Sequence, residues 1–297
     1  MSPARENRPT TVLLGLVKGG VKHPFSIDVE FHDGLTQTQQ QAFRDAADRW
    51  LKIIGGGGPP VVAGGETIQS LLVVAKCEKL PDREGGLSAN TDLDLKALRK
   101  PEAGPAAGLP GKATITLDLT DMTKLDKNEA AAGGAQTKDI ARYRVDLIAH
   151  EIGHALGLSR VVWERKGLLK TNLHTGSPVF TGAAAAKAYG AALQSGPTPV
   201  PLEVFGDREE FIAHWRQAFF HSELMTFILE DRPNVIGPIT VAALQDLGYE
   251  VNPAAAETNE VDFTGTAPVE PPIEKLTYQI SHVLRDERWL NCRVHAS

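Results

Sequence analysis

The segment that most constrains the fold of this chain is AHEIGHALGLSR, residues 149–160, which places polar residues at helical spacing within an apolar frame. His150 and His154 are four residues apart, so in an α-helix they lie on one face and can present two imidazole nitrogens to one metal ion. Glu151 lies beside the first histidine, where a carboxylate can take a proton from a metal-activated water. The alternative is a pair of core histidines hydrogen-bonded to carbonyl groups. We favour a zinc-binding helix, because a helix that served burial alone would have little reason to carry these three residues at its centre.

Two histidines leave a zinc site incomplete, since hydrolytic zinc sites commonly have three protein ligands and a water. Arg160 stands where a third ligand would follow, and a permanent cation cannot bind a metal ion. Gly157 allows the chain to turn sharply after the helix. The third ligand must therefore come from further along the chain, where the candidates are His174, His214 and His221, or a glutamate as in thermolysin-like peptidases (Glu203, Glu209 or Glu210).

Several segments accompany the motif in a fixed order: GLTQTQQQAFRDAADRWLKII before it, and FTGAAAAKAYG, VPLE, AHWRQAFFHSELMT and ITVAALQDLGYEVN after it. With HEIGHALG, they resemble the leishmanolysin-type metzincin zinc metallopeptidases in a minimal, bacterial-like form, over roughly residues 24–253. In that family an insertion separates the HExxHxxG helix from a third histidine, which lies in an HW context before an ELMT methionine turn. The resemblance implies that His150, His154 and His214 bind zinc, that Glu151 is the general base, and that Met225 forms the methionine turn.

The function that this resemblance implies is zinc-dependent endopeptidase activity, with a metal-activated water, a glutamate base and an extended protein or peptide substrate. Two alternatives remain open. One is a thermolysin-like peptidase with a glutamate as third ligand. The other is a non-catalytic, zinc-stabilised binding protein on a peptidase fold, against which the intact Glu151 argues.

The hydrophobic pattern predicts an alternation of strands and helices in the first half of the chain. Its expected elements are a strand over 25–31, a helix from Thr36 or Thr38 to about Ile54, core strands over 68–75 and 113–120, and the motif helix from Thr137 or Tyr143 to Leu156. Residues 78–112 are poor in large apolar groups, and we expect a surface excursion with a short edge strand near GGLSAN.

The second half has weaker patterns, with helices expected over 182–194, 211–220 and about 276–284, and a short capped helix within 240–253 that ends at Gly248. The expected class is α+β and metzincin-like: a twisted mixed β-sheet with two long helices in an upper lobe, and an irregular, mostly helical lower lobe. The expected divisions are an N-terminal segment (1–22), an upper catalytic lobe (23–158), a lower lobe with the third ligand and methionine turn (159–255), and a tail without an assigned role (256–297).

Composition excludes several partners. A net charge of −6 gives no basis for binding nucleic acid or anionic membrane. No stretch approaches the ~20 apolar residues that cross a bilayer. The short apolar run Val12–Val17 favours a buried strand over a signal peptide. We therefore expect a soluble protein, either cytoplasmic or exported without a cleaved N-terminal signal. Cys77 and Cys292 favour two free thiols over one bridge, with Cys77 buried.

For the acidic residues that could bind calcium and for Tyr249, we favour a structural role over a functional one. Calcium could bind Asn90, Asp92 and Asp94 or the Asp118/Asp121 pair, although solvated acidic loops are favoured. Tyr249 follows Gly248 at the end of an expected helix, so it is expected to pack and not to stabilise an oxyanion.

Overall fold

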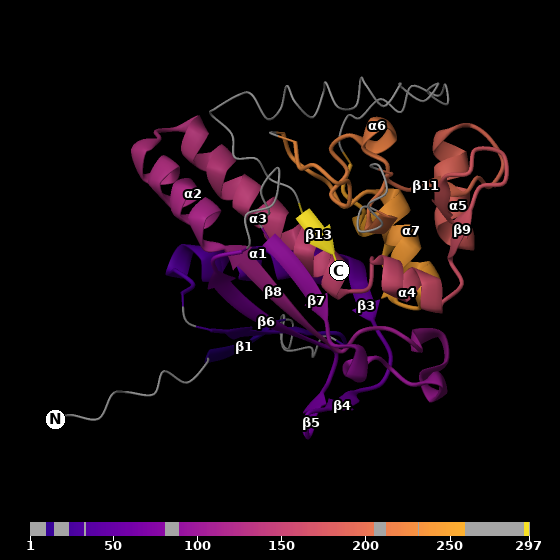
Figure 1. Cartoon of the computed structure of the whole chain (residues 1–297), viewed down its shortest axis with the longest axis horizontal. Coiled ribbons are helices and arrows are strands. Elements are labelled where there is room, and N and C mark those ends of the chain that lie inside the picture. The colour runs from indigo at the N-terminus through magenta and orange to yellow at the C-terminus, as the bar shows by residue number, and fades with distance from the viewer. Residues whose placement is uncertain are drawn as a thin grey trace.

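The computed structural model describes residues 10–14, 24–32, 34–80, 89–204, 212–230, 232–258 and 294–296. Its largest element is a six-stranded mixed sheet with the strand order β1-β2-β6-β8-β7-β13 (Figure 1). The central strands β2, β6 and β8 are parallel, whereas β1 and β7 are antiparallel to their neighbours β2 and β8, and β13 is parallel to β7. The strands are β1 (Thr10–Leu14), β2 (Ile27–Phe31), β6 (Leu71–Glu78), β7 (Ala89–Leu93), β8 (Lys112–Asp118) and β13 (Val294–Ala296).

The alternating strand predicted over 25–31 is confirmed, since Phe25, Ile27, Val29 and Phe31 are all buried. The core strand predicted over 68–75 was placed too early. Ile68 belongs to a separate hairpin of β4 (Val61–Ala63) and β5 (Glu66–Ile68). The hairpin turns through Gly64 and Gly65, both with positive φ, and the core strand starts only at Leu71.

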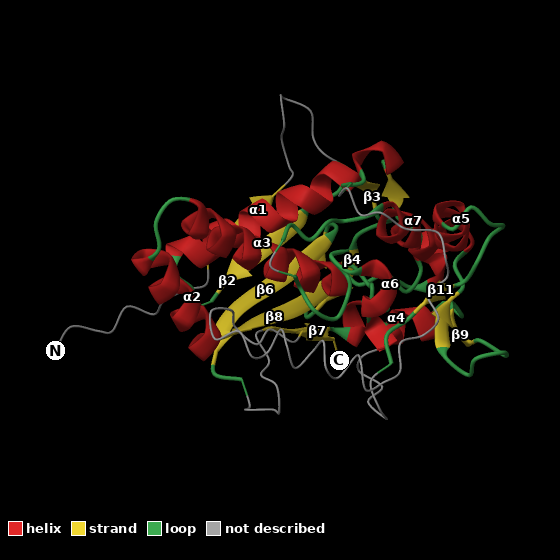
Figure 2. Ribbon diagram, turned by 90° about the horizontal axis from the view of Figure 1, so that it is seen from above, coloured by secondary structure: helices red, strands yellow, loops and turns green. Residues whose placement is uncertain are grey.

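Two long helices cover one face of the sheet. Helix α1 (Gln37–Ile53) begins at the predicted cap Thr36, which forms a reciprocal capping box with Gln39. It packs against α3 (Ala135–Ala155), the motif helix; α1 also contacts β1 and β2, while α3 contacts β6, β7 and β8 (Figure 2). The indole of Trp50 donates a hydrogen bond of 2.8 Å to the carbonyl oxygen of Ala149, which joins the two helices directly.

A helix that the sequence analysis missed precedes α3. The strand predicted over 113–120 ends at Asp118, whose carboxylate accepts a 2.9 Å hydrogen bond from the backbone N–H of Asp121 and so caps α2 (Leu119–Ala131). This helix is bound to α3 by Arg144, which is buried and pairs with Asp126 and Glu129 at 2.9 and 2.7 Å. The polar composition of this stretch hid a helix that buries Met122 and Leu125 in the core and is joined to α3 by ion pairs.

The short strand expected near GGLSAN is present as β7, which lies between β8 and β13 in the sheet. The surface excursion expected around it was wrong in part, because the short helices η1 (Leu95–Ala97) and η2 (Pro101–Ala106) follow β7 and bury Ala97 and Ala106. Arg99 is buried and donates hydrogen bonds to the carbonyl oxygens of Ser70 and Pro110 at 2.6 and 2.7 Å. A charged residue can thus take the place of an apolar one, because backbone carbonyl groups satisfy its guanidinium.

The second half of the chain gathers beyond one end of the main sheet (Figure 1). Helices α5 and α7 pack on each other, and α7 ends at Gly248 in the left-handed conformation, as predicted. The elements are α4 (Arg160–Arg165), β9 (Leu169–Thr171), β10 (Pro178–Phe180), α5 (Ala183–Ala192), β11 (Val200–Pro201), α6 (Gln217–Phe220), α7 (Pro238–Leu247), β12 (Glu250–Val251), which pairs with β3 (Ile54–Gly56), and η4 (Pro253–Ala255).

The helix predicted over 211–220 is reduced to the single turn of α6. Trp215, expected on that helix, forms isolated bridges in extended backbone and stacks on Trp163 at 5.4 Å, with Phe180 against its edge. The aromatic side chains Trp215 and Phe220 of this segment therefore pack in a cluster between chain segments, and this packing overrides the local preference for a helix.

Some expectations fall on residues that the structure does not describe, namely Val17, Cys292 and the helix expected near 276–284. Cys77 is a buried free thiol in β6, as expected. None of the described helices is long and apolar enough to cross a membrane.

Candidate metal centre

The motif helix α3 carries both predicted helical ligands and the predicted base within its last two turns. His150, Glu151 and His154 are each fully buried. Buried apolar residues on the same helix, including Ile148 and Ile152, pack it into the core. The three polar side chains are thus held in an environment where any unmatched charge or lone pair is costly.

A backbone carbonyl orients each of the two imidazoles. Nδ1 of His150 lies 2.6 Å from the carbonyl oxygen of Leu224, and Nδ1 of His154 lies 2.6 Å from that of Leu158. A carbonyl oxygen only accepts hydrogen bonds, so both Nδ1 atoms must carry the proton and donate it. Burial, and then the neighbouring His154, lowers the pKa of His150 well below its usual value, so this ring is neutral with a lone pair on Nε2.

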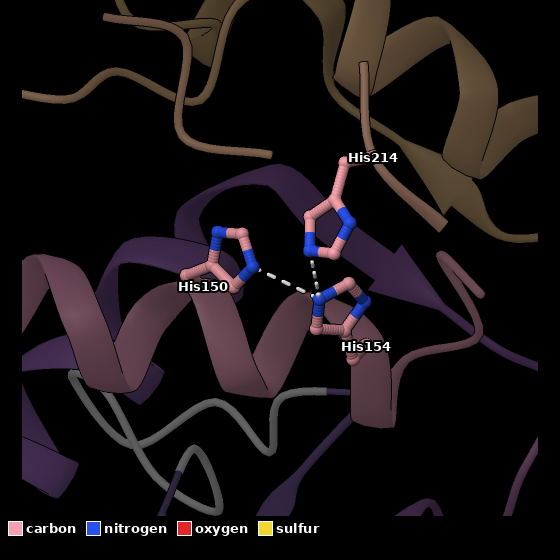
Figure 3. Close-up of side chains that lie close together, drawn as sticks. All are labelled: His150, His154 and His214. Atoms are coloured by element: carbon pink, nitrogen blue, oxygen red, sulfur yellow. Dashed lines mark hydrogen bonds between the residues drawn. The ribbon is translucent and has the colours of Figure 1, made fainter. Parts of the chain in front are cut away.

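His214 meets this pair from the second half of the chain. Nε2 of His154 lies 2.9 Å from Nε2 of His150 and 3.2 Å from Nε2 of His214 (Figure 3). When both rings are neutral, the close approach of the first two nitrogens brings two lone pairs together, which is unfavourable unless a cation is shared between them. The three nitrogens lie within 4.8 Å of one another, the only such group of three metal-ligating side chains in the described part of the chain.

The donor set fits zinc. Neutral imidazole nitrogens are preferred zinc ligands, and zinc–nitrogen distances of ~2.0–2.1 Å place tetrahedral ligand atoms about 3.3 Å apart. The Nε2 separations of 2.9 and 3.2 Å are close to this value. Three protein ligands also leave the fourth position open, as in hydrolytic zinc sites.

Long-range backbone contacts hold His214 in place. The N–H of Glu203 donates to the carbonyl oxygen of His214 at 2.9 Å, and the N–H of Trp215 donates to that of Met225 at 3.0 Å. His214 is fully buried, with its ring against that of Phe227. Its position is therefore set by two other segments of the chain and not by a helix of its own.

Met225 packs against the motif helix at a glycine. A Cβ added to Gly153 would lie 2.4 Å from Sδ of Met225 and 3.0 Å from Cζ2 of Trp50. The missing side chain at Gly153 therefore makes room for the methionine on the helix turn that carries His150 and His154. The predicted turn methionine and the motif helix are in direct contact through this gap.

Glu151 has a partner that the sequence analysis did not find. The hydroxyl of Thr91, on strand β7, donates a hydrogen bond to Oε2 of Glu151, while no described residue donates to the buried Oε1. Burial raises the pKa of Glu151 to about 8, against the lowering effect of Thr91 and with a smaller contribution from Asp92. Nothing in the sequence around Thr91 marks it, because its role depends on which strand lies beside α3.

The other candidate ligands lie apart from the three histidines. His221 is exposed, with Nδ1 4.0 Å from Oε1 of Glu230, and His174 is exposed in a loop, as expected. Glu203 is buried, but its carboxylate accepts backbone hydrogen bonds from Val204 and Gln217. Glu209 and Glu210 lie outside the described residues.

The acidic residues considered for calcium have structural partners. Asp118 is buried and caps α2, so the expectation of a solvated loop was wrong for this residue. Asp94 caps η1 by accepting from the N–H of Lys96, and Asn90 donates to Asp92 at 2.9 Å. Tyr249 packs at right angles to Phe25 and donates to the carbonyl oxygen of Leu156, so it has the packing role predicted.

The mixed α+β fold brings three buried histidines together at one point, where they could hold a metal ion. Comparison with known families gives the more specific result: residues 127–262 match the sequence model of the leishmanolysin family, which supports a leishmanolysin-type metallopeptidase. The match covers a little under half of the chain and includes all three histidines and Met225. A comparison with curated proteins gave no match.

Proposed function

We propose that this protein is a zinc-dependent endopeptidase of metzincin architecture. The observation that carries the proposal is the approach of the three Nε2 atoms, two of which are the lone-pair nitrogens of their rings in the neutral form, because Nδ1 of each ring donates to a carbonyl group. His150, His154 and His214 would hold the ion. When bound, zinc would supply a Lewis acid that lowers the pKa of water to about 7 and polarises the scissile carbonyl group.

Glu151 would act as the general base. Burial raises its pKa to about 8, so the carboxylate is a stronger base than an exposed glutamate once it is ionised, and the charge of a bound cation would favour that ionised form. Thr91 binds Oε2 and fixes the orientation of the carboxylate, while Oε1 is free of described donors and can receive a proton. Glu151 would then return this proton to the amine that leaves when the peptide bond breaks.

The edge of the main sheet would bind the substrate in extended form. Strand β7 carries Thr91, which contacts Glu151, so this strand runs beside the proposed base. The chain's own residues 294–296 pair with β7 through the backbone, which supports the ability of this edge to accept another strand. A peptide that took the place of residues 294–296 on β7 would lie along the sheet next to the three histidines.

The decisive experiment combines metal analysis with hydrolysis of an unstructured protein such as casein. The wild-type protein should hold one zinc ion per chain, cleave the substrate, lose activity with a chelator and regain it with zinc. Glu151→Gln should keep its zinc but lose activity by about 10²–10⁴-fold, the usual contribution of a positioned base. Zinc binding without any hydrolysis by the wild-type protein would instead favour the non-catalytic binding protein.

A further inference from the structure

A buried carboxylate without a described cationic partner lies two residues before the turn methionine. Glu223 is 4% exposed, and its Oε2 accepts a 2.6 Å hydrogen bond from the backbone N–H of Met225. Its Oε1 accepts from the N–H of Gly237 at 3.2 Å and from the hydroxyl of Thr240. A buried carboxylate is costly unless its oxygens are satisfied, and here neutral donors satisfy both of them.

Thr240 extends this network to the residue next to the third histidine. The indole Nε1 of Trp215 donates to Oγ1 of Thr240 at 2.7 Å, so the hydrogen of that hydroxyl is left to donate to Glu223. The indole is fully buried and stacks on Trp163, and its position fixes the backbone on which His214 lies. One carboxylate therefore connects the methionine turn, helix α7 and the segment that carries His214.

The same turn orients a ligand on the motif helix. Leu224, between Glu223 and Met225, provides the carbonyl oxygen that accepts from Nδ1 of His150 at 2.6 Å. The carbonyl oxygen of Met225 accepts from the N–H of Trp215 at 3.0 Å. A change in the conformation of this turn would thus alter both the orientation of the His150 imidazole and the position of the segment that carries His214.

We propose that Glu223 is a positioning residue for the metal centre, acting through Met225 and through the Thr240–Trp215 hydrogen bonds. The inference rests on the proposed zinc site at His150, His154 and His214. Partners of metal ligands commonly change metal affinity by 10–100-fold when they are removed. A residue that only stabilised the fold would lower the free energy of unfolding without a selective loss of zinc affinity.

The test compares zinc affinity in variants, measured by competition with a chromophoric chelator at neutral pH. Thr240→Val keeps the branched shape but removes the hydroxyl, which breaks the link between Glu223 and Trp215. It should weaken zinc binding about 10-fold or more, whereas Thr240→Ser, which keeps the hydroxyl, should bind nearly as the wild type does. Glu223→Gln should also weaken binding, because its amide nitrogen cannot accept a hydrogen bond.

Asp246→Asn provides a matched control on the same helix. The carboxylate of Asp246 also caps backbone groups, accepting from the N–H of Ala184 and Ala185 at 2.9 Å each, but these belong to α5. This variant should lower the free energy of unfolding and leave zinc affinity unchanged. Its comparison with Thr240→Val separates loss of positioning from general loss of stability.

The outcomes separate the inference from the function on which it rests. If His214→Ala loses zinc but Thr240→Val and a folded Glu223→Gln bind it with wild-type affinity, Glu223 has no positioning role and only the inference fails. If the wild-type protein binds no zinc, the proposed function fails first. Should Glu223→Gln not fold, the Thr240→Val and Thr240→Ser pair still decides the question.

Discussion

The metal centre has two halves that are built in different ways. His150 and His154 lie on consecutive turns of α3, so the spacing of their backbones is set by the geometry of a helix that packs on the sheet. His214 lies at a bend in the chain, where contacts with Glu203 and with the methionine turn hold it and the residue after it. The first half is specified by local periodicity, whereas the second depends on hydrogen bonds between segments distant in sequence.

The two halves are therefore expected to respond differently to mutation. A regular helix loses little geometry when one side chain changes, because its remaining backbone hydrogen bonds persist. The segment with His214 and Trp215 has few regular backbone hydrogen bonds, so each tertiary contact has a larger share in its position. The network from Glu223 to Trp215 is therefore expected to matter more for the metal than any comparable contact on α3.

The largest loss of zinc affinity is expected when a ligand is removed, and it should be similar for either half of the metal centre. His154→Ala and His214→Ala should each weaken zinc binding by about 100-fold or more, since four-ligand zinc sites gain about 10–16 kcal/mol in total, or ~3 kcal/mol per ligand. Isothermal titration with zinc would measure both. Glu203→Gln serves as the control and should keep zinc. If instead His214→Ala kept zinc and Glu203→Gln lost it, the site would have the thermolysin-like arrangement with a glutamate ligand.

An intermediate effect, on the free energy of unfolding, is expected at Gly153, where the motif helix contacts Met225. Gly153→Ala should lower the free energy of unfolding by about 1–3 kcal/mol, because the new Cβ would overlap Sδ of Met225. In an isolated helix the same change would stabilise the helix by ~1 kcal/mol. A destabilising effect would therefore indicate that Met225 packs against residue 153. Urea unfolding would measure it, with Gly133→Ala, whose Cβ would meet open space, as the control. A stabilised Gly153→Ala protein would show that the methionine does not pack there.

The smallest effect on stability and zinc affinity is expected at Arg160, the position where a third ligand would follow the motif. Arg160 is the first residue of α4, and its guanidinium pairs with Glu164 at 2.7 Å on the surface. Arg160→Ala should cost only about 0.3–0.5 kcal/mol of stability and leave zinc affinity unchanged. In a His214→Ala background, Arg160→His should not restore zinc binding. Restoration, measured by the same titration, would mean that the chain after Gly157 can reach the ion without the second half.

Local patterns predicted much of the first half and the class of chemistry. The capping box at Thr36, the buried stripe of α1 and the end of the motif helix at Gly157 all follow from contacts within a few residues. Helix α2 and the buried Arg99 were missed, because an ion pair with α3 and hydrogen bonds to distant carbonyl groups stabilise them. Neither kind of contact produces a periodic hydrophobic pattern in the sequence.

A spacing of four residues is enough to place two imidazoles and a carboxylate together on one helix, because helical geometry converts that spacing into a common face. The orientation of the two rings came from folding, since the carbonyl groups of Leu158 and Leu224 accept hydrogen bonds from their Nδ1 atoms. Folding also placed Thr91 against Glu151 and Glu223 under the turn beside them. These contacts join strands, turns and helices, most of them far apart in sequence, so hydrogen-bonding distance is reached only when the chain is packed.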